Sequence, residues 1–233
     1  MAYSRPPGLD ARPSAGELTA RMAGIGMKFA AEPEPNADIE LTLVHAAEVG
    51  MDDGDLRVLS ILTTWLGVHH RYVNVDRLLR AAKNHDSNRV KAYWSAIGSW
   101  LAPDRRFARL EKLRKRTRIH VLTSGSEFQL KRRGEDERFA GSALRVPAGV
   151  LRDRSQDVLS PTRLAEVHCG YSNRVQQGPS WRADVWTVLE AEPETSVSDA
   201  ARIVRCSFAV AWEVVRDFTL LNPAGSGAAP IPS

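Results

Sequence analysis

The chain has 233 residues, and its hydrophobic (43%) and charged (26%) fractions are ordinary for a soluble protein with two modest domains. Its apolar runs are too short for a transmembrane helix and its N-terminus lacks a secretory signal pattern, so we expect a cytoplasmic protein without a membrane partner. The two cysteines, Cys169 and Cys206, have no paired spacing, so neither a disulfide framework nor a zinc knuckle is expected.

The charge is mildly basic and unevenly distributed. The formal net charge is +4. Eight Lys and Arg residues lie between Arg105 and Arg118, opposed only by Glu111, whereas the segment Asp184–Asp199 holds five acidic residues and no Lys or Arg. Charge this polarised indicates a face that binds a polyanion.

The first 35 residues are rich in proline and small polar residues. We expect residues 1–35 to form a flexible, loosely attached arm, with one helix over residues 16–29 at helical apolar spacing. Residues 38–49 are expected to form a helix or to begin as a strand. The first folded domain is predicted to span residues 36–140.

Three amphipathic helices are predicted in that domain, because apolar residues repeat there at helical spacing. They cover roughly residues 56–66, 75–83 and 88–101. Each follows a polar residue of the kind that caps a helix: Asp55, Asn74, and Asp86 or Ser87. A short strand is expected at residues 72–73.

The third of these helices presents small and basic residues outward when its apolar stripe faces inward. The outward set is Arg89, Lys91, Ala92, Ser95 and Ser99. Small residues let a helix backbone approach the major groove of DNA, and Arg or Lys reach phosphates or the acceptor edge of guanine. We therefore expect Arg89, Lys91 and Ser95 to approach or read bases.

Two strand-like runs, residues 107–113 and 117–122, are predicted to pair as a β-hairpin with a basic turn. Its cations are expected to hold phosphate, as a wing does beside a recognition helix: Arg109, Arg114, Lys115, Arg116 and Arg118. A basic hairpin is alternatively a dimerisation element or a solvated sheet edge. The basic turn favours DNA binding, because a dimerisation hairpin has no need of it.

A polar connector over residues 134–141 marks the predicted domain boundary. Residues 141–222 are expected to form a second helical domain, and residues 223–233 a disordered tail. The elements predicted around the boundary are a strand, a helix begun by Pro161 and a loop, at residues 128–134, 158–169 and 170–180.

The last segment has the pattern of a helix-turn-helix. Its helices are predicted to begin at Trp181, after Ser196 or Ser198, and after Ser207. Small and apolar residues fall at the positions that this motif uses: Ala200, Ala201, Val204, Cys206, Ala211 and Val214. Arg205 occupies the turn position where glycine is commonest.

The outward face of the last helix carries fewer hydrogen-bond donors than the outward face of the helix predicted over residues 88–101. Ser207 and Arg216 are candidates for base recognition, with Trp212 in apolar contact and Glu213 repelling phosphate. A core or dimer interface explains these helices equally well.

Patterns typical of enzymes are absent from the sequence. It contains no P-loop, no glycine-rich dinucleotide fingerprint and no serine in a nucleophile-elbow context. His168 and Cys169 are a neighbouring pair of residues that could bind a metal, but two ligands do not make a site. We expect no enzyme, no cofactor and no metal.

The order of elements over residues 55–122 resembles the winged helix-turn-helix superfamily of DNA-binding regulators. In that resemblance residues 88–101 match the recognition helix and residues 114–118 the wing tip. A winged helix followed by a second domain is also similar to antitoxins of the AbiEi type, which repress their own operon and oppose a nucleotidyltransferase-like toxin. Two tandem winged helices are similar to plasmid replication initiators. The implied fold is mainly α with small β-hairpins (α+β), in two tandem helix-turn-helix or winged-helix modules.

The function expected from these patterns is transcriptional regulation by a dimer that binds double-stranded DNA. One alternative is an interaction protein whose C-terminal helices bind a toxin or a second copy of the chain. Another is a replication initiator that binds repeated origin sites.

Overall fold

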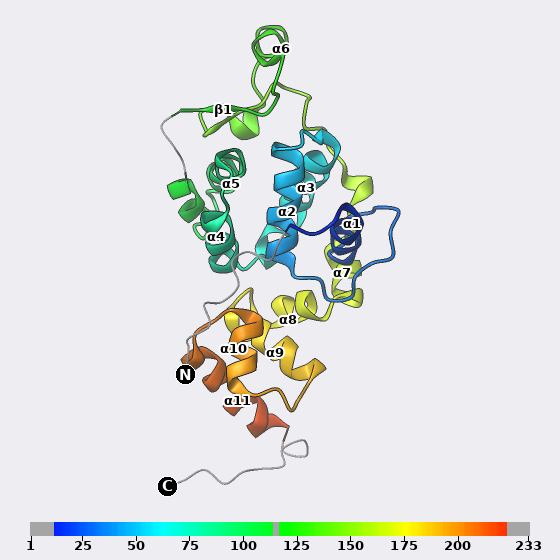
Figure 1. The fold of residues 1–233 in the computed structure, drawn as a ribbon, viewed down its shortest axis with the longest axis vertical. Coiled ribbons are helices and arrows are strands. Elements are labelled where there is room, and N and C mark those ends of the chain that lie inside the picture. The colour runs from blue at the N-terminus through cyan, green and yellow to red at the C-terminus, as the bar shows by residue number, and fades with distance from the viewer. Residues whose placement is uncertain (1–11, 114–116, 223–233) are drawn as a thin grey trace. The chain divides into compact units, whose positions relative to one another are not determined.

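The structure is a computed structural model that describes residues 12–113 and 117–222 (Figure 1). Its described residues divide into two compact units, one formed by residues 12–113 and 117–167 and the other by residues 168–222. We call the described parts the N-terminal unit (12–167) and the C-terminal unit (168–222). Helices dominate both, and the sheet in the described residues has two short strands, which agrees with the mainly α class.

The N-terminal unit begins with five helices, each preceded by a polar cap. They are α1 (Ala15–Gly24), α2 (Ile39–Met51), α3 (Leu56–His69), α4 (Val75–Asn84) and α5 (Asn88–Trp100). Their cap side chains accept backbone N–H groups that no helical carbonyl can reach: Ser14, Asp38, Asp55, Asn74 and Ser87. The three predicted amphipathic helices are confirmed, and residues 38–49 are helical.

Helix α5 lies at the centre of this unit and is covered on several sides. It packs against α2, α4, β2 (Leu144–Arg145) and two 3-10 helices, η2 (Phe107–Leu113) and η3 (Glu137–Phe139). Tyr93 and Trp94 are fully buried in it. A Cβ added to Gly98 would lie 3.0 Å from the Phe107 carbonyl oxygen, so the glycine permits the close approach of η2.

The predicted β-hairpin is wrong. Residues 107–113 form η2, because Phe107 and Leu110, three residues apart, both face α5 and are fully buried. The strand β1 (Ile119–His120) pairs in parallel with β2, and not with residues 107–113. No wing of the predicted kind is formed by the described residues.

Two further strand predictions are replaced by helices. Residues 128–134 lie largely in α6 (Ser126–Arg133), since its residues are mostly good helix formers and Gly125 and Gly134 end the helix at positive φ. Tyr72 is the last residue of the 3-10 helix η1 (His70–Tyr72), and Val73 follows it. A last 3-10 helix, η4 (Ser155–Asp157), precedes α7 (Pro161–Val167), which begins at the predicted proline.

The boundary between units lies at residues 167/168 and not near 134–141. Residues 141–167 belong to the N-terminal unit because backbone pairs tie them to it: Ile119 with Leu144, Glu135 with Pro147, and Met27 with Val158.

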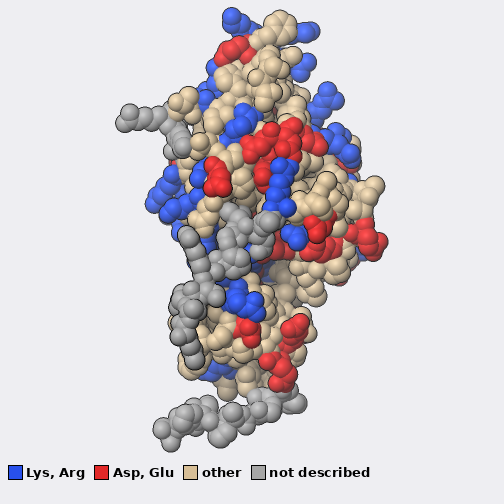
Figure 2. Space-filling view, viewed as in Figure 1, with Lys and Arg blue, Asp and Glu red and all other residues tan. Residues whose placement is uncertain are grey.

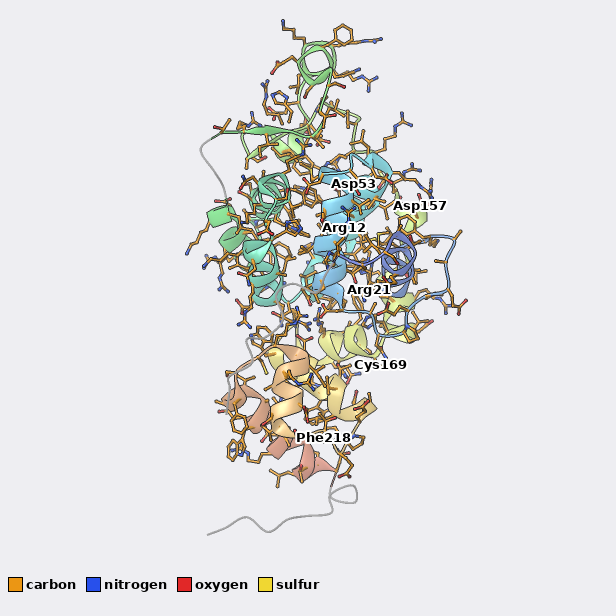
Figure 3. The ribbon with its side chains drawn as sticks, in the orientation of Figure 1. Arg12, Arg21, Asp53, Asp157, Cys169 and Phe218 are labelled. Atoms are coloured by element: carbon orange, nitrogen blue, oxygen red, sulfur yellow. The ribbon has the colours of Figure 1, made fainter. Side chains whose placement is uncertain are left out.

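The described part of the predicted arm is also built into the N-terminal unit. Ile25 is fully buried, and the Trp65 indole donates a 2.8 Å hydrogen bond to its carbonyl oxygen. Arg12 forms an ion pair with Asp53, as Figure 3 shows. The expectation of a loosely attached arm therefore fails for residues 12–35, and residues 1–11 lie outside the described part.

The C-terminal unit consists of four helices, and three of them share an apolar core. The helices are α8 (Cys169–Gln177), α9 (Trp181–Ala191), α10 (Val197–Val204) and α11 (Phe208–Leu221). The core residues are Val185, Leu189, Ala200, Val204, Ala211 and Val214. At its margin the ring of Phe218 (labelled in Figure 3) meets Trp186 edge-on, with centroids 5.0 Å apart.

Helix α8 replaces a predicted loop. It is fixed by a buried ion pair, in which Arg174 Nη2 lies 2.7 Å from Asp184 Oδ1 of α9, and by the buried Tyr171. An ion pair inside the unit leaves no apolar stripe in the sequence, which is why the periodicity does not reveal this helix.

Within the ranges 12–113 and 117–222, every helix is too short or too polar to span a bilayer.

Candidate nucleic-acid interface

Helices α10 and α11 are joined by a tight turn at Arg205 and Cys206. Arg205 adopts the left-handed conformation (φ 62°, ψ 36°) at the position where glycine is commonest. The Cys206 N–H donates to the Ala201 carbonyl oxygen at 3.0 Å, a bond that closes the C-terminus of α10. The Ser207 hydroxyl then accepts the Val210 N–H and begins α11. The turn predicted from this segment is therefore present.

Four of the six small and apolar positions predicted for this segment are buried, and Ala201 and Cys206 are half-buried at the edge of the core. Ala200, Val204, Ala211 and Val214 form most of the core beneath the turn, and α9 packs against both helices. Burying these small and branched side chains fixes the angle between α10 and α11, which leaves the opposite face of α11 available to a partner.

The outward face of α11 carries the predicted residues and one more. Ser207, Trp212 and Arg216 are all exposed. The helical spacing of Phe208, Ala211, Val215 and Phe218 predicts that Phe208 points inward. It is instead 58% exposed and lies one turn before Trp212, itself 48% exposed. The sequence signal for Phe208 is its spacing of four from Trp212, which sets a second stripe beside the buried one.

Arg216 is held in place by two neighbours. Its guanidinium carbon lies 5.3 Å from the centre of the Trp212 ring, and its Nη2 donates to Asp217 Oδ1 at 2.9 Å. Arg182 of α9 donates to the other Asp217 oxygen at 2.7 Å. Hydrogen bonds from Arg182 and then Arg216 lower the pKa of Asp217, so this carboxylate stays charged and orients Arg216.

The face predicted on α5 is not available to a ligand. Ser95 is only 1% exposed, and its hydroxyl donates to the Glu111 carbonyl oxygen at 3.3 Å. Ala92 is also buried. Arg89 donates to the carbonyl oxygens of Met51 (2.7 Å) and Val121 (3.0 Å) and so clamps the loops around α5. The expectation that Arg89 and Ser95 face outward is wrong, and Lys91 is only partly exposed.

The cations predicted on the wing have different positions. Arg118 is part-buried and donates to the carbonyl oxygens of Ser142 (2.7 Å) and Leu144 (3.0 Å) while it pairs with Glu135. It therefore has a structural role. Arg109 is exposed on η2, where it pairs with Asp76 of α4. Arg114, Lys115 and Arg116 lie outside the described residues.

A basic surface remains around η2, which we call the η2 face and define as Arg105, Arg109 and Lys112. All three are exposed, and η2 packs beside α4, where Lys83 is also exposed. Figure 2 shows Lys and Arg gathered over the flank of the N-terminal unit where η2 and α4 lie in Figure 1.

The two units differ in sign of charge. Residues 12–167 carry 26 Lys and Arg and 20 Asp and Glu, a net charge of +6. Residues 168–222 carry five and seven, a net charge of −2. The unit that contains the α10–turn–α11 segment is thus acidic, and in the basic unit the face predicted on α5 is largely covered.

Among the described residues, no group of three or more His, Cys, Asp or Glu side chains is arranged to hold a metal ion. Searches of protein-family models, curated proteins and solved structures found no match to the chain. Its chemistry is therefore inferred from its own geometry and charge.

Proposed function

We propose that the chain is a double-stranded-DNA-binding regulator in which α11 enters the major groove. The observation that carries the proposal is the α10–turn–α11 geometry: a closed left-handed turn at Arg205, a serine cap on α11, and an exposed N-terminal half of α11. In helix-turn-helix proteins the N-terminal residues of the second helix contact base edges. In α11 these are Ser207, Phe208 and Trp212, and Arg216 lies one turn beyond Trp212.

Each exposed side chain has a chemical role in this proposal. The Arg216 guanidinium is a bidentate donor suited to guanine O6 and N7, and the Ser207 hydroxyl donates or accepts. Trp212 provides an apolar contact for a thymine methyl group and keeps Arg216 extended by lying beneath it. Glu213 repels phosphate, so its favourable partner in a groove is the cytosine amino group.

Phosphate contacts must come largely from outside the acidic C-terminal unit. A reader with a net charge of −2 gains little from counterion release. The η2 face in the N-terminal unit supplies three exposed cations on the same chain. We therefore assign sequence preference to α11 and much of the salt-dependent affinity to the N-terminal unit.

The test is selection of binding sites from a random duplex library with the whole chain. We expect one enriched sequence, and we expect Arg216→Gln to relax preference at particular base pairs, at a cost of about 1–3 kcal/mol each. Arg163→Gln, an exposed cation on α7, is the control with the same charge change. If no sequence is enriched, or if both variants behave alike, α11 does not read bases.

A second candidate function is protein interaction through the C-terminal unit. The observation that favours it is a set of exposed apolar side chains: Ile203, Phe208, Trp212, Leu220 and Leu221. They would serve a second copy of the chain or another protein, such as a toxin. Sedimentation velocity measured over a range of protein concentrations tests whether the chain forms a homodimer. Leu220 is 73% exposed, so Leu220→Ser should weaken self-association and leave the fold unchanged.

A further inference from the structure

Helix α6 projects from the N-terminal unit as a short, separately anchored knob (Figure 1). It is held from below, because the buried Ser126 hydroxyl lies 2.6 Å from His120 Nδ1 on β1 and Leu130 points into the unit. Glu127 is engaged by Arg145 of β2, with Nη1 at 2.7 Å. Contacts within the unit therefore fix the base of α6.

The outer face of α6 combines one aromatic ring with cations. Phe128 is 64% exposed, and Lys131 and Arg132 follow three and four residues later, which places all three on one side of the helix, opposite Leu130. Arg133 is exposed at the end of the helix. Within the described ranges, none of these three cations forms an ion pair, in contrast with Arg109, Arg118 and Arg145.

We propose that this α6 knob binds the phosphate backbone of a nucleic acid. Three exposed cations within one turn of helix attract a polyanion and release counterions when they contact its phosphates. An exposed Phe beside them is the side chain that stacks on bases or contacts sugars in such sites. Cations near a helix C-terminus also stabilise the helix itself, but that role needs neither three of them nor an exposed ring.

An anionic membrane surface fits the knob less well. A helix that lies in a membrane interface needs a broad apolar face several turns long. The apolar side of α6 faces the protein, and Phe128 is its single large apolar side chain turned to solvent. The knob has the positive charge that attracts a polyanion but lacks the apolar area that binding in a membrane interface requires, so a nucleic acid fits it better.

This inference does not depend on α11. The knob belongs to the unit with a net charge of +6 and offers contact with any sequence, whereas α11 is assigned base preference. If both hold, one chain touches nucleic acid with two elements, and the second contact gains from the high effective concentration that the first creates.

The test uses the full chain with Lys131→Gln, Arg132→Gln and Arg133→Gln combined. The matched control combines Lys28→Gln, Arg152→Gln and Arg163→Gln, three exposed cations elsewhere on the same unit, so that both variants lose three charges. Binding is measured over a salt series to a random duplex, to a single-stranded oligonucleotide and to phosphatidylserine vesicles. Thermal unfolding verifies that both variants fold.

We expect the knob variant to lower the slope of log affinity against log salt on duplex DNA by about two to three units, since each phosphate contact contributes about 0.9. The control should lower it by less than about one unit. Phe128→Ala should weaken binding without changing the slope. If the knob variant loses binding only to the single-stranded oligonucleotide, α6 is still a nucleic-acid site, but one for single strands.

Equal slopes in the knob variant and its control would overturn the proposal, as would loss of vesicle binding with nucleic-acid binding intact. The knob variant should retain the base preference of the unmodified chain, so failure here is distinguishable from failure of α11 as a reader.

Discussion

Arg205 shows how one residue sets the geometry of the candidate reader. Left-handed backbone costs a non-glycine residue about 1–2 kcal/mol, and a β-branched residue tolerates it least. Arg205→Gly should therefore keep or raise the stability of the C-terminal unit, and Arg205→Val should lower it by about 1–2 kcal/mol. Amide hydrogen exchange in α10 and α11 measures this. Arg202→Val, on the exposed side of α10, is the control. It loses helix propensity and an exposed ion pair with Asp199, and should cost about 0.5–1 kcal/mol in total. Equal effects of the two valines would argue against a strained turn.

A second prediction at this scale concerns His69 in the N-terminal unit. Burial lowers its pKa from 6.5 to about 4, and its Nε2 lies 3.0 Å from the Leu159 carbonyl oxygen, so the neutral ring donates that hydrogen bond. Because the folded state favours the neutral form, stability is complete above pH 6.5 and falls as pH drops toward 4. The loss is about 3 kcal/mol over that window.

Denaturant unfolding at pH 7 and pH 4.5 tests the assignment to His69. His69→Gln keeps an N–H donor but does not titrate in this range, so its stability should depend less on pH. The same pH dependence in both proteins would assign the effect to other groups, among them His45, whose pKa is also lowered by burial.

At the scale of elements, caps and apolar spacing were enough to predict most of the helices. Asp55, Asn74 and Ser207 cap helices where the sequence indicates. The position of α5 could not be predicted in the same way. Small residues such as Ala92 and Ser95 are suited to the approach of a DNA backbone, and they are equally suited to the close packing of η2. Composition alone does not separate these two uses of a small side chain.

Gly98 provides a direct test of that packing. An added Cβ would lie 3.0 Å from the Phe107 carbonyl oxygen and from Leu110 Cβ, both in η2. Gly98→Ala should therefore lower the stability of the N-terminal unit by about 1–3 kcal/mol, since overpacking outweighs the gain in helix propensity. Gly16→Ala, in α1 with open space around the site, should be neutral or stabilising. If both variants unfold at the same denaturant concentration, α5 is less tightly covered than described.

At the scale of the whole molecule, the sequence showed that charge is unevenly distributed, but the basic wing predicted from that distribution was wrong. Cations between Arg105 and Arg118 were assigned to a wing beside the first helical module. The structure has η2 at residues 107–113, and Arg118 donates to carbonyl oxygens. The helix that we propose as the DNA-reading element lies in the acidic C-terminal unit instead. Long-range contacts such as Ile119 with Leu144 caused this difference, because pairing partners distant in sequence leave no local signal.

We propose that the N-terminal unit supplies phosphate contacts and that α11 supplies base preference. These separate roles predict how the DNA affinity of the full chain depends on salt. Gln substitutions at Arg105 and Lys112 should lower affinity for all duplexes alike and reduce the salt slope by about one to two units. Base preference should remain, because α11 is unchanged. A changed preference in this variant, measured by binding to two unrelated duplexes, would contradict the separation.

The central claim is that α11 is the element inserted into DNA. The most direct measurement is the change in backbone amide NMR shifts of the full chain on adding a duplex selected from a random library. We predict that the largest changes fall in residues 205–216, with smaller changes in η2 and α6. Tight binding with changes confined to the N-terminal unit would contradict the claim and leave the C-terminal helices to a protein partner.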